Sequence, residues 1–443
     1  MIHNLRKMLF TAFSLTLSMT VLPSCTFTSD KKQTFEKVTD TDYSITYYWG
    51  PSASEFNEDV VIKMKEAGFD IVPLQRFAYD YEMNKTALDL LKKHGLNAAV
   101  TDGRISSLYY DNAPQSRIDT VVAEVVEYYK DYDNIKEWII CDEPSAAKFD
   151  VIGRITDAIH RLAPGAKAYV NLLPNYAPAD MLGTSSYEEY LNSFCEKVQP
   201  DYICFDYYDL LGDDTTVSHR GLYLENHEQA RSAGMKYNKE NRVIVLLIKH
   251  GPYSNVSYTE VVWQSNLSLL FGNKSLSFFT FSLPTEDKNF VWSDAMVEGD
   301  GSTTPHYEYV KKANAETRVL GNALYNTEAE KVFCIDNTNT ASFTIGIPMY
   351  SSYGALADIE GGKDMLVSFY NNGSFLLMNG NSDPDMPSTL TTKSIKGSLQ
   401  WLNPKTSRWE SIHSSPYIKQ NRDTTYDITL NSAQAVLLRV AVT

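Results

Sequence analysis

Short apolar runs alternate with amphipathic segments from about residue 43 to residue 313. The apolar runs have the length of strands and lack a polar face, whereas the segments between them carry apolar residues at helical spacing. Glycine follows three of these segments, at Gly68, Gly95 and Gly165, where a left-handed residue commonly ends a helix. The pattern predicts strands at 44–49, 70–74, 97–101, 137–141, 168–172, 202–206, 243–248 and 277–281. It predicts helices at 58–67, 87–94, 118–129, 151–162, 187–198, 225–237 and 259–270.

This alternation predicts an α/β fold. Strands that are apolar on both faces and joined by helices form a parallel sheet that is covered on both sides. Eight such units in about 270 residues match the size of a (β/α)₈ TIM barrel, which we place at 41–315. An open, doubly wound sheet is the alternative, but the chain lacks its glycine-rich fingerprint.

The pattern changes after a last helix at 307–324. Short strands separated by clusters of Asn, Asp, Gly and Ser are typical of an all-β sandwich, and we predict this smaller domain at 316–443. Its expected strands lie at 332–335, 341–347, 365–370, 374–378, 397–402 and 435–440.

The first residues have the features of an export signal. Arg6 and Lys7 precede an apolar stretch, 8–22, that is too short for a membrane-spanning helix. The sequence from Leu22 to Cys25 resembles a bacterial lipobox. We expect a lipoprotein signal peptide at 1–24, a lipid on Cys25 and a tether over 25–40, with simple cleavage near Ser24 as the alternative. The protein is then lipid-anchored in the bacterial cell envelope, at the outer membrane, either periplasmic or surface-facing.

Composition narrows the partners. The chain has 443 residues and a formal net charge of −15, which argues against binding to nucleic acid and favours a neutral ligand. A membrane is expected to be contacted through the lipid anchor only. The cysteines form no CxxC pair and the histidines no HExxH motif, so neither a metal nor a cofactor is expected.

In a TIM barrel, chemistry is carried by residues at the carboxyl ends of the strands. The predicted strand ends supply carboxylates, amides and aromatic rings, a combination that suits the hydroxyl groups and C–H faces of a carbohydrate. The candidate substrate-binding residues are Trp49, Arg76, Asp102, Arg104, Asp142, Asn171, Asn175, Tyr176, Tyr207, Tyr208, His250, Glu286 and Trp292.

One of these strand ends carries a family resemblance. The run Trp138-Ile139-Ile140-Cys141-Asp142-Glu143-Pro144 resembles the Asn-Glu-Pro motif that ends strand four in clan-A glycoside hydrolases, in which the Glu is the acid/base. The segments 279–284 with Trp292, 301–307 with Asn314, 399–404 and 435–440 add to the likeness, which is to the β-galactosidase-like branch with its C-terminal sandwich. The resemblance spans nearly the whole mature chain. It implies hydrolysis of an oligo- or polysaccharide with Glu143 as general acid.

The chain departs from that family at two points. Asp142 replaces the usual Asn, and the predicted strand seven is followed by Lys249-His250-Gly251, with no nucleophilic Glu. Because glycosidic hydrolysis normally needs two carboxyl groups, a second one must come from elsewhere. Strand alternation places Glu143 on the pore side with Cys141 and Asp206 with Cys204.

We therefore expect Asp206 or Asp209 to act as base or nucleophile, with activation of water in an inverting arrangement as the working hypothesis. The remaining candidates for the second carboxylate are Asp102, Asp142 and Glu286.

Structural roles compete with each assignment. Glu143 could pair with Arg104 or Lys249, and Asp206 could orient Arg76 or Arg104. The two amides, Asn171 and Asn175, could cap the turn after strand five. The alternative function is a non-catalytic, carbohydrate-binding envelope lipoprotein that has lost its strand-seven nucleophile.

Overall fold

The computed structural model describes residues 36–212, 217–284, 291–336 and 346–441. The predicted signal peptide, Cys25, Glu286 and most of the predicted strand at 341–347 lie outside these residues. No helix among the described residues is long and apolar enough to cross a membrane.

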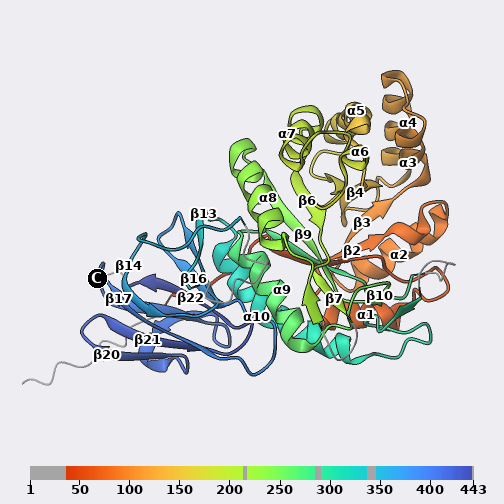
Figure 1. The fold of residues 1–443 in the computed structure, drawn as a ribbon. Coiled ribbons are helices and arrows are strands. Elements are labelled where there is room, and N and C mark those ends of the chain that lie inside the picture. Colours follow the sequence, from red (N-terminus) through yellow and green to blue (C-terminus); the bar gives the residue numbers. More distant parts are fainter. Residues whose placement is uncertain (1–35, 213–216, 285–290, 337–345, 442–443) are drawn as a thin grey trace, which may run out of the picture. The chain divides into compact units, whose positions relative to one another are not determined.

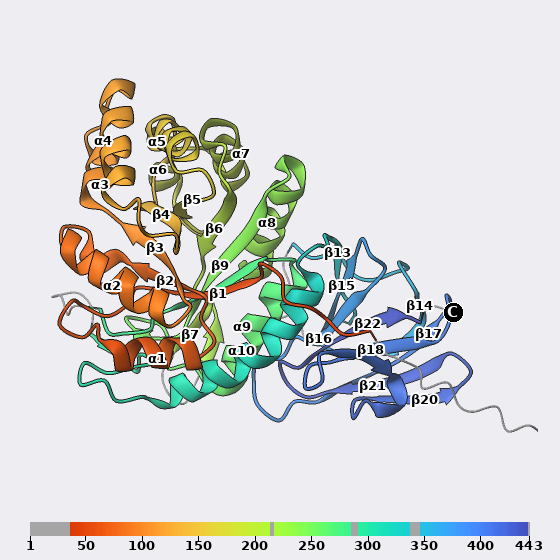
Figure 2. The same cartoon turned by 180° about the vertical axis from the view of Figure 1, so that it is seen from behind.

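Parallel strands close into the predicted barrel (Figures 1 and 2). Their order around the barrel is β1-β11-β9-β6-β5-β4-β3-β2, so neighbours in space are neighbours in sequence apart from two inserted hairpin regions. The barrel strands are β1 (Ser44–Tyr48), β2 (Ile71–Leu74), β3 (Asn97–Thr101), β4 (Ile135–Asp142), β5 (Lys167–Leu172), β6 (Tyr202–Asp206), β9 (Glu240–Leu246) and β11 (Ser275–Phe279).

Helices cover the outside of the barrel, as the two views show. Polar side chains begin several of them: Asn57 accepts the Val60 N–H, and Ser257 and Glu260 form a capping box. The helices are α1 (Glu58–Glu66), α2 (Tyr81–Lys93), α3 (Gly103–Tyr110), α4 (Gln115–Tyr128), α5 (Phe149–Leu162), α6 (Ala179–Leu182), α7 (Tyr187–Val198), α8 (Tyr223–Tyr237), α9 (Tyr258–Leu270) and α10 (Pro305–Leu324).

Small antiparallel pairs are inserted after two barrel strands. The pair β7 (Leu210–Gly212) and β8 (Val217–His219) follows β6, and β10 (Lys249–His250) pairs with β12 (Trp292–Ser293). The predicted strands at 243–248 and 277–281 begin and end earlier than expected, since β9 ends at Leu246 and β11 at Phe279. His250 therefore belongs to β10 and not to the end of a barrel strand, a difference that apolar pattern alone does not reveal.

The C-terminal region forms the predicted β-sandwich. One sheet has the order β13-β15-β16-β22-β18-β19 and the other β14-β17-β21-β20. Their strands are β13 (Ala329–Cys334), β14 (Leu356–Gly361), β15 (Met365–Tyr370), β16 (Phe375–Asn379), β17 (Ser388–Ser394), β18 (Leu399–Asn403), β19 (Arg408–Ser411), β20 (Ile418–Arg422), β21 (Thr425–Leu430) and β22 (Ala435–Val440). Residues such as Val367, Leu377 and Ile428 form a core between the sheets.

Helix α9 joins the two domains. Buried residues occur on all its faces, because barrel strands cover one side and the sandwich the other. Polar groups fix the junction: Trp263 Nε1 donates to Gly380 O at 2.8 Å and Asn266 Nδ2 to Ala433 O at 2.8 Å, and Tyr370 donates to Leu269 O at 2.8 Å.

A buried ion pair crosses the barrel interior near its amino end. Arg242 of β9 donates to both carboxylate oxygens of Glu137 in β4, at 2.9 and 2.6 Å. Glu137 is 1% and Arg242 3% exposed. The guanidinium also lies 4.3 Å from the ring centroid of Tyr202. Two strands that β5 and β6 separate in the barrel are thus joined by a bidentate, buried contact.

Replacing Glu137 alone should destabilise the protein. In the Glu137→Ala variant the Arg242 cation stays buried without its partner, which costs about 3–5 kcal/mol, visible as a lower urea midpoint. The double variant Glu137→Leu/Arg242→Met removes both charges and should recover much of this loss. Equal losses in the single and double variants would show that packing, and not an uncompensated charge, sets the cost.

Candidate active site

Two strand ends bring carboxyl groups together at the carboxyl face of the barrel. Asp142 is the last residue of β4, Glu143 follows it, and Asp206 is the last residue of β6. The strand between them, β5, carries Asn171. Its Nδ2 donates to Asp142 at 2.9 Å and to Asp206 at 3.2 Å. The amide therefore bridges the two carboxylates and fixes their spacing.

Glu143 reaches this cluster through an unusual backbone. Its φ is +46°, in the left-handed region that costs a non-glycine residue energy, and its N–H donates to Asn171 O at 2.8 Å. The preceding strand is irregular, with a bulge relative to β5 between Ile139 and Cys141. A hydrogen bond joins the carboxyl groups of Glu143 and Asp206. Backbone strain at this position is thus used to place the Glu143 side chain against Asp206.

The predicted alternation holds for β6 but not for β4. Cys204 contacts Asn171 Oδ1 at 3.7 Å, on the same interior side as Asp206. In β4, Asp142 and Glu143 are neighbours in sequence and yet both reach the cluster, Asp142 through Asn171 and Glu143 through Asp206. The bulge and the left-handed turn explain the difference, because each interrupts the period of two.

Electrostatics favour a shared proton in the carboxyl pair. Burial and then the charge of Asp142 raise the pKa of Glu143 to about 7. Asp206 is 8% exposed, and burial, followed by the charges of Glu143 and Asp142, raises its pKa as well. Burial also raises the pKa of Asp142, although hydrogen bonds from Asn171 and Tyr48 oppose the shift. Two carboxyl groups in contact cannot both ionise easily, so the pair holds a proton near neutral pH.

Aromatic side chains surround the cluster. The Tyr48 hydroxyl hydrogen-bonds Asp142, and Tyr208 stacks on Phe279 with ring centroids 5.5 Å apart. The charges of Asp206, Asp142 and Glu143 add to burial in raising the pKa of Tyr208. Tyr176 is half-buried, and Asp206 acts on its pKa in the same direction. These rings offer the apolar faces on which a sugar packs.

His250 and Trp292 extend this aromatic wall. Their ring centroids are 4.7 Å apart, and His250 lies 5.8 Å from Tyr208. His250 Nδ1 bonds to Ile248 O at 2.9 Å, and burial lowers the pKa of the imidazole, which keeps it neutral near pH 7. The ligand-facing role of Trp292 and His250 stays a prediction; His250 packs against Tyr208, and Trp292 packs against His250 and Phe279.

Asp209 is engaged elsewhere. It is 1% exposed, and its carboxylate lies 2.5 Å from His219 Nδ1 and accepts the Gly221 N–H at 3.2 Å. His219 Nε2 is in turn 3.2 Å from Ser382 Oγ of the sandwich. This chain of hydrogen bonds ties the loop after β6 to the C-terminal domain. Asp209 is thus engaged with His219, whereas Asp206 lies with Glu143.

Several other predicted residues serve the scaffold. Asp102 is fully buried, caps α3 and binds Arg104 at 2.9 and 2.7 Å, which leaves neither for Glu143 or Asp206. Tyr207 is fully buried and donates to Gly221 O. Asn175 Nδ2 donates to Gln229 Oε1 at 3.1 Å.

Arg76 shows why strand-end position alone misleads. Its guanidinium lies 3.5 Å from Glu55 and donates to Leu283 O at 3.4 Å, so it links loops around the mouth. Polar residues at strand ends also close loops, and the sequence does not distinguish the two uses.

Gln75 and the already predicted Trp49 carry buried polar atoms at strand ends. Both amide atoms of Gln75, after β2, are buried without a hydrogen-bond partner among the described residues, and so is Nε1 of the predicted Trp49, after β1. Buried polar atoms are rarely left unpaired, so such groups are candidates for ligand contacts. Gln75 was identifiable by position, whereas the contact of Tyr48 with Asp142 depends on which way β1 faces.

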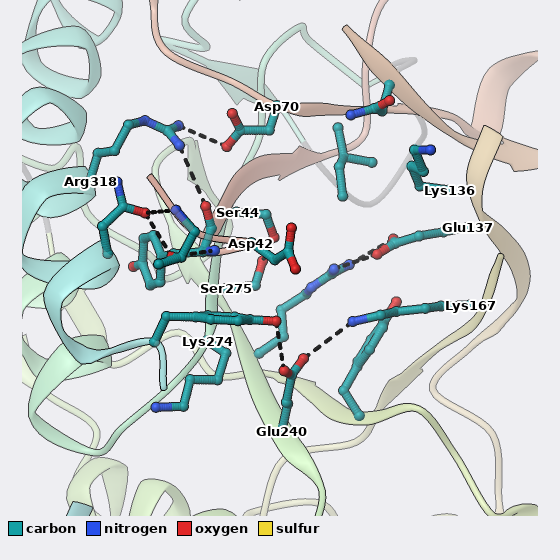
Figure 3. Close-up of a pocket in the computed structure, with 18 of the residues that line it drawn as sticks. Asp42, Ser44, Asp70, Lys136, Glu137, Lys167, Glu240, Lys274, Ser275 and Arg318 are labelled. Carbon is teal, nitrogen blue, oxygen red and sulfur yellow. Dashed lines mark hydrogen bonds and ion pairs between the residues drawn. The ribbon is translucent and has the colours of Figure 1, made fainter. Parts of the chain in front are cut away.

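A cavity of about 630 Å³ lies at the opposite, amino end of the barrel (Figure 3). Residues at the strand starts line it, and opposite charges there are paired: Lys167 with Glu240 at 3.2 Å and Arg318 with Asp70 at 2.7 Å. Such paired charges stabilise the closed barrel, and the chemistry of TIM barrels belongs to the other face. No group of three or more His, Cys, Asp or Glu suited to a metal occurs in the described part of the chain.

The shared proton can be tested by nuclear magnetic resonance. A carboxyl ¹³C titration of Glu143, assigned with Glu143→Gln, should show a midpoint near pH 7 instead of the ordinary 4.5. Asp142→Asn removes a negative charge that opposes ionisation, so the midpoint should fall. Asp119→Asn, on the surface of α4 and paired with Arg161 at 2.7 Å, is the matched control and should leave it unchanged. An ordinary midpoint in the unmodified protein would contradict the proposed pair.

Comparison with known proteins supports the fold. No protein-family model matches the chain, and no curated protein matches its sequence. Among solved structures, a glycoside hydrolase family 5 protein from Bacteroides vulgatus matches with a TM-score of 0.55 and 12% identity over 90% of this chain and 89% of that one. A β-galactosidase from Bacillus circulans sp. alkalophilus matches with a TM-score of 0.55 and 9% identity over 90% and 99%. At such identities the likeness shows the fold, and it confirms the predicted resemblance to glycoside hydrolases with a barrel followed by a sandwich.

Proposed function

We propose that the protein is a glycoside hydrolase that cleaves an oligo- or polysaccharide at the carboxyl face of its barrel. The observation that carries this proposal is the hydrogen-bonded pair of Glu143 and Asp206, with a raised pKa on both carboxyl groups. A carboxylic acid that keeps its proton near neutral pH is what protonation of a glycosidic oxygen requires. The fold shared with glycoside hydrolases and the surrounding aromatic rings agree with a carbohydrate substrate.

Glu143 acts as the general acid in this mechanism. It protonates the leaving oxygen, while Asp206 supplies the second carboxyl group as nucleophile or base. The Asn171 amide bridges Asp142 and Asp206 and so positions the pair, and the negative charge of Asp142 favours the protonated form of Glu143. Deprotonation of Glu143 above about pH 7 removes the acid, so activity should decline as pH rises through that value.

We propose that Asp206 attacks the anomeric carbon directly. Inverting enzymes keep their carboxyl groups about 6.5–9.5 Å apart to hold a water between them, and retaining enzymes about 5–5.5 Å. A hydrogen-bonded pair is closer than either range and nearer to the retaining one. We therefore propose a covalent glycosyl-enzyme intermediate in place of water activation, which predicts products of retained anomeric configuration in an NMR time course.

Removing the acid should abolish turnover. Glu143→Gln should lower kcat about 10²- to 10⁴-fold on a panel of aryl glycosides and polysaccharides, measured as aglycone or reducing-end release. Glu127→Gln, an exposed residue of α4 that pairs with Lys130, is the matched control and should leave kcat unchanged.

The second candidate function has its own observation. Strand β9 ends at Leu246, and no carboxylate stands at that end or in the four residues that follow it. A barrel that has lost its nucleophile can still bind sugar. Binding of an oligosaccharide without product release from the unmodified protein would favour this alternative and refute the hydrolase. Product release that survives Glu143→Gln would refute the role assigned to Glu143.

We also propose that a lipid on Cys25 anchors the protein in the cell envelope. In a bacterial host, Cys25→Ser should move the protein from the membrane fraction to the soluble fraction, and metabolic labelling with a fatty acid should be lost with it. Unchanged fractionation and labelling would contradict the anchor.

A further inference from the structure

An arginine at the carboxyl face of the barrel contacts tyrosines and, among the described residues, no carboxylate. Arg220 follows β8 and is half-buried. Its guanidinium lies 4.3 Å from the ring centroid of Tyr176 and 5.4 Å from that of Tyr253. Its Nη2 donates to the Tyr253 hydroxyl at 2.8 Å and its Nε to Tyr208 O at 3.4 Å. Three tyrosines of the mouth thus hold the cation in place.

The pairing of Arg220 differs from that of other arginines in the barrel. Arg104, Arg242 and Arg318 each contact a carboxylate within 2.7 Å. Within the described residues, Arg220 contacts none, and its Nη1 donates to no protein acceptor. A guanidinium carries five N–H donors in a planar fork that fits an anion with two oxygens. Part of that fork is therefore uncommitted.

The position of Arg220 relates it to the proposed chemistry. Its backbone N–H donates to Asp209 O at 2.8 Å and its Nε to Tyr208 O at 3.4 Å, so Arg220 lies against the segment that directly follows Asp206. Its guanidinium also contacts the Tyr176 ring, on whose pKa the charge of Asp206 acts. A ligand group held by Arg220 therefore lies at the same face of the barrel as the proposed catalytic pair. The Tyr176 ring supplies a face on which a sugar unit packs.

We propose that Arg220 binds the acidic group of a charged sugar, a carboxylate or a sulfate, in a subsite adjacent to the Glu143–Asp206 pair. This inference rests on the proposed function and specifies its substrate class. Two oxygens of the acidic group accept from the free part of the guanidinium fork, and the Tyr253 hydroxyl keeps that fork oriented.

The overall negative charge of the protein does not oppose this assignment. The net charge of −15 is spread over the whole chain, and fields from exposed charges are screened beyond about 8–10 Å at physiological salt. Within the mouth, the proton held by Glu143 and Asp206 lowers the local negative charge. The guanidinium supplies the positive charge that a bound anion needs. Net charge favours a neutral ligand, whereas the guanidinium of Arg220 favours an acidic one at this place.

Binding to a glycan array tests the subsite independently of turnover. The protein carries Glu143→Gln so that no glycan is cleaved, and the array holds oligogalacturonides, oligoglucuronides and sulfated galactan oligosaccharides beside their carboxyl-reduced or desulfated counterparts. We expect capture of an acidic glycan at least about tenfold tighter than of its neutral counterpart, with a loss at high salt. The preference between carboxylated and sulfated chains identifies the acidic group.

Variants separate charge recognition from a structural role. Arg220→Gln should reduce affinity for the acidic glycan about tenfold or more and leave that for the neutral one unchanged, and Arg220→Lys should restore part of it, since the charge returns without the fork. Tyr253→Phe removes the orienting hydroxyl and keeps the charge, so it should cost less than Arg220→Gln. Thermal unfolding of each variant checks that the fold is retained.

The outcomes distinguish this inference from the proposed function. Capture of neutral glycans only, capture of none, or an Arg220→Gln variant that keeps the full preference for the acidic glycan would overturn the acidic subsite. If the protein hydrolyses only a neutral glycoside, and Arg220→Gln hydrolyses it at an unchanged rate, the subsite is overturned and the hydrolase is kept. Arg220-dependent capture of an acidic glycan that the protein with Glu143 intact never cleaves would keep the subsite and overturn the hydrolase.

Discussion

The hydrogen bond between Glu143 and Asp206 is the interaction on which the site depends. Two acidic groups approach each other only if one keeps a proton. Burial of both groups and the negative charge of Asp142 beside them raise their pKa values and so favour the protonated form. The barrel makes the contact possible, because β5 holds Asn171 between β4 and β6 and so sets the distance between their ends. The left-handed backbone of Glu143 completes it.

The two ends of the barrel use charge in opposite ways. At the amino end, Glu137 pairs with Arg242 and Asp70 with Arg318, so these charges are neutralised by their partners. At the carboxyl end, like charges gather in one cluster, and among the described residues tyrosines, not carboxylates, contact the Arg220 guanidinium. In a paired arrangement, the opposite charges hold the elements together and the groups are not reactive. A clustered arrangement costs stability and shifts the pKa of its members, which is the pattern expected of a reactive site.

The sequence predicts the architecture well because hydrophobic period and helix-ending glycines are local signals. Each barrel strand overlaps its predicted run, although β9 and β11 begin and end earlier. The role of single polar side chains depends on non-local partners. Asp206 ends β6 and Asp209 follows three residues later, yet their partners differ. Asp209 bonds to His219, which contacts Ser382, whereas Asp206 bonds to Glu143. Likewise Arg76 contacts Glu55 and Arg104 contacts Asp102, and a bulge in β4 interrupts the simple alternation of side chains.

The most direct test of the central claim is a crystal structure of the Glu143→Gln variant with an uncleaved oligosaccharide bound. The account predicts a glycosidic oxygen within hydrogen-bonding distance of the side-chain amide at position 143 and the adjoining anomeric carbon in reach of an Asp206 oxygen. A sugar chain bound away from both residues, or one whose anomeric carbon Asp206 cannot approach, would contradict it.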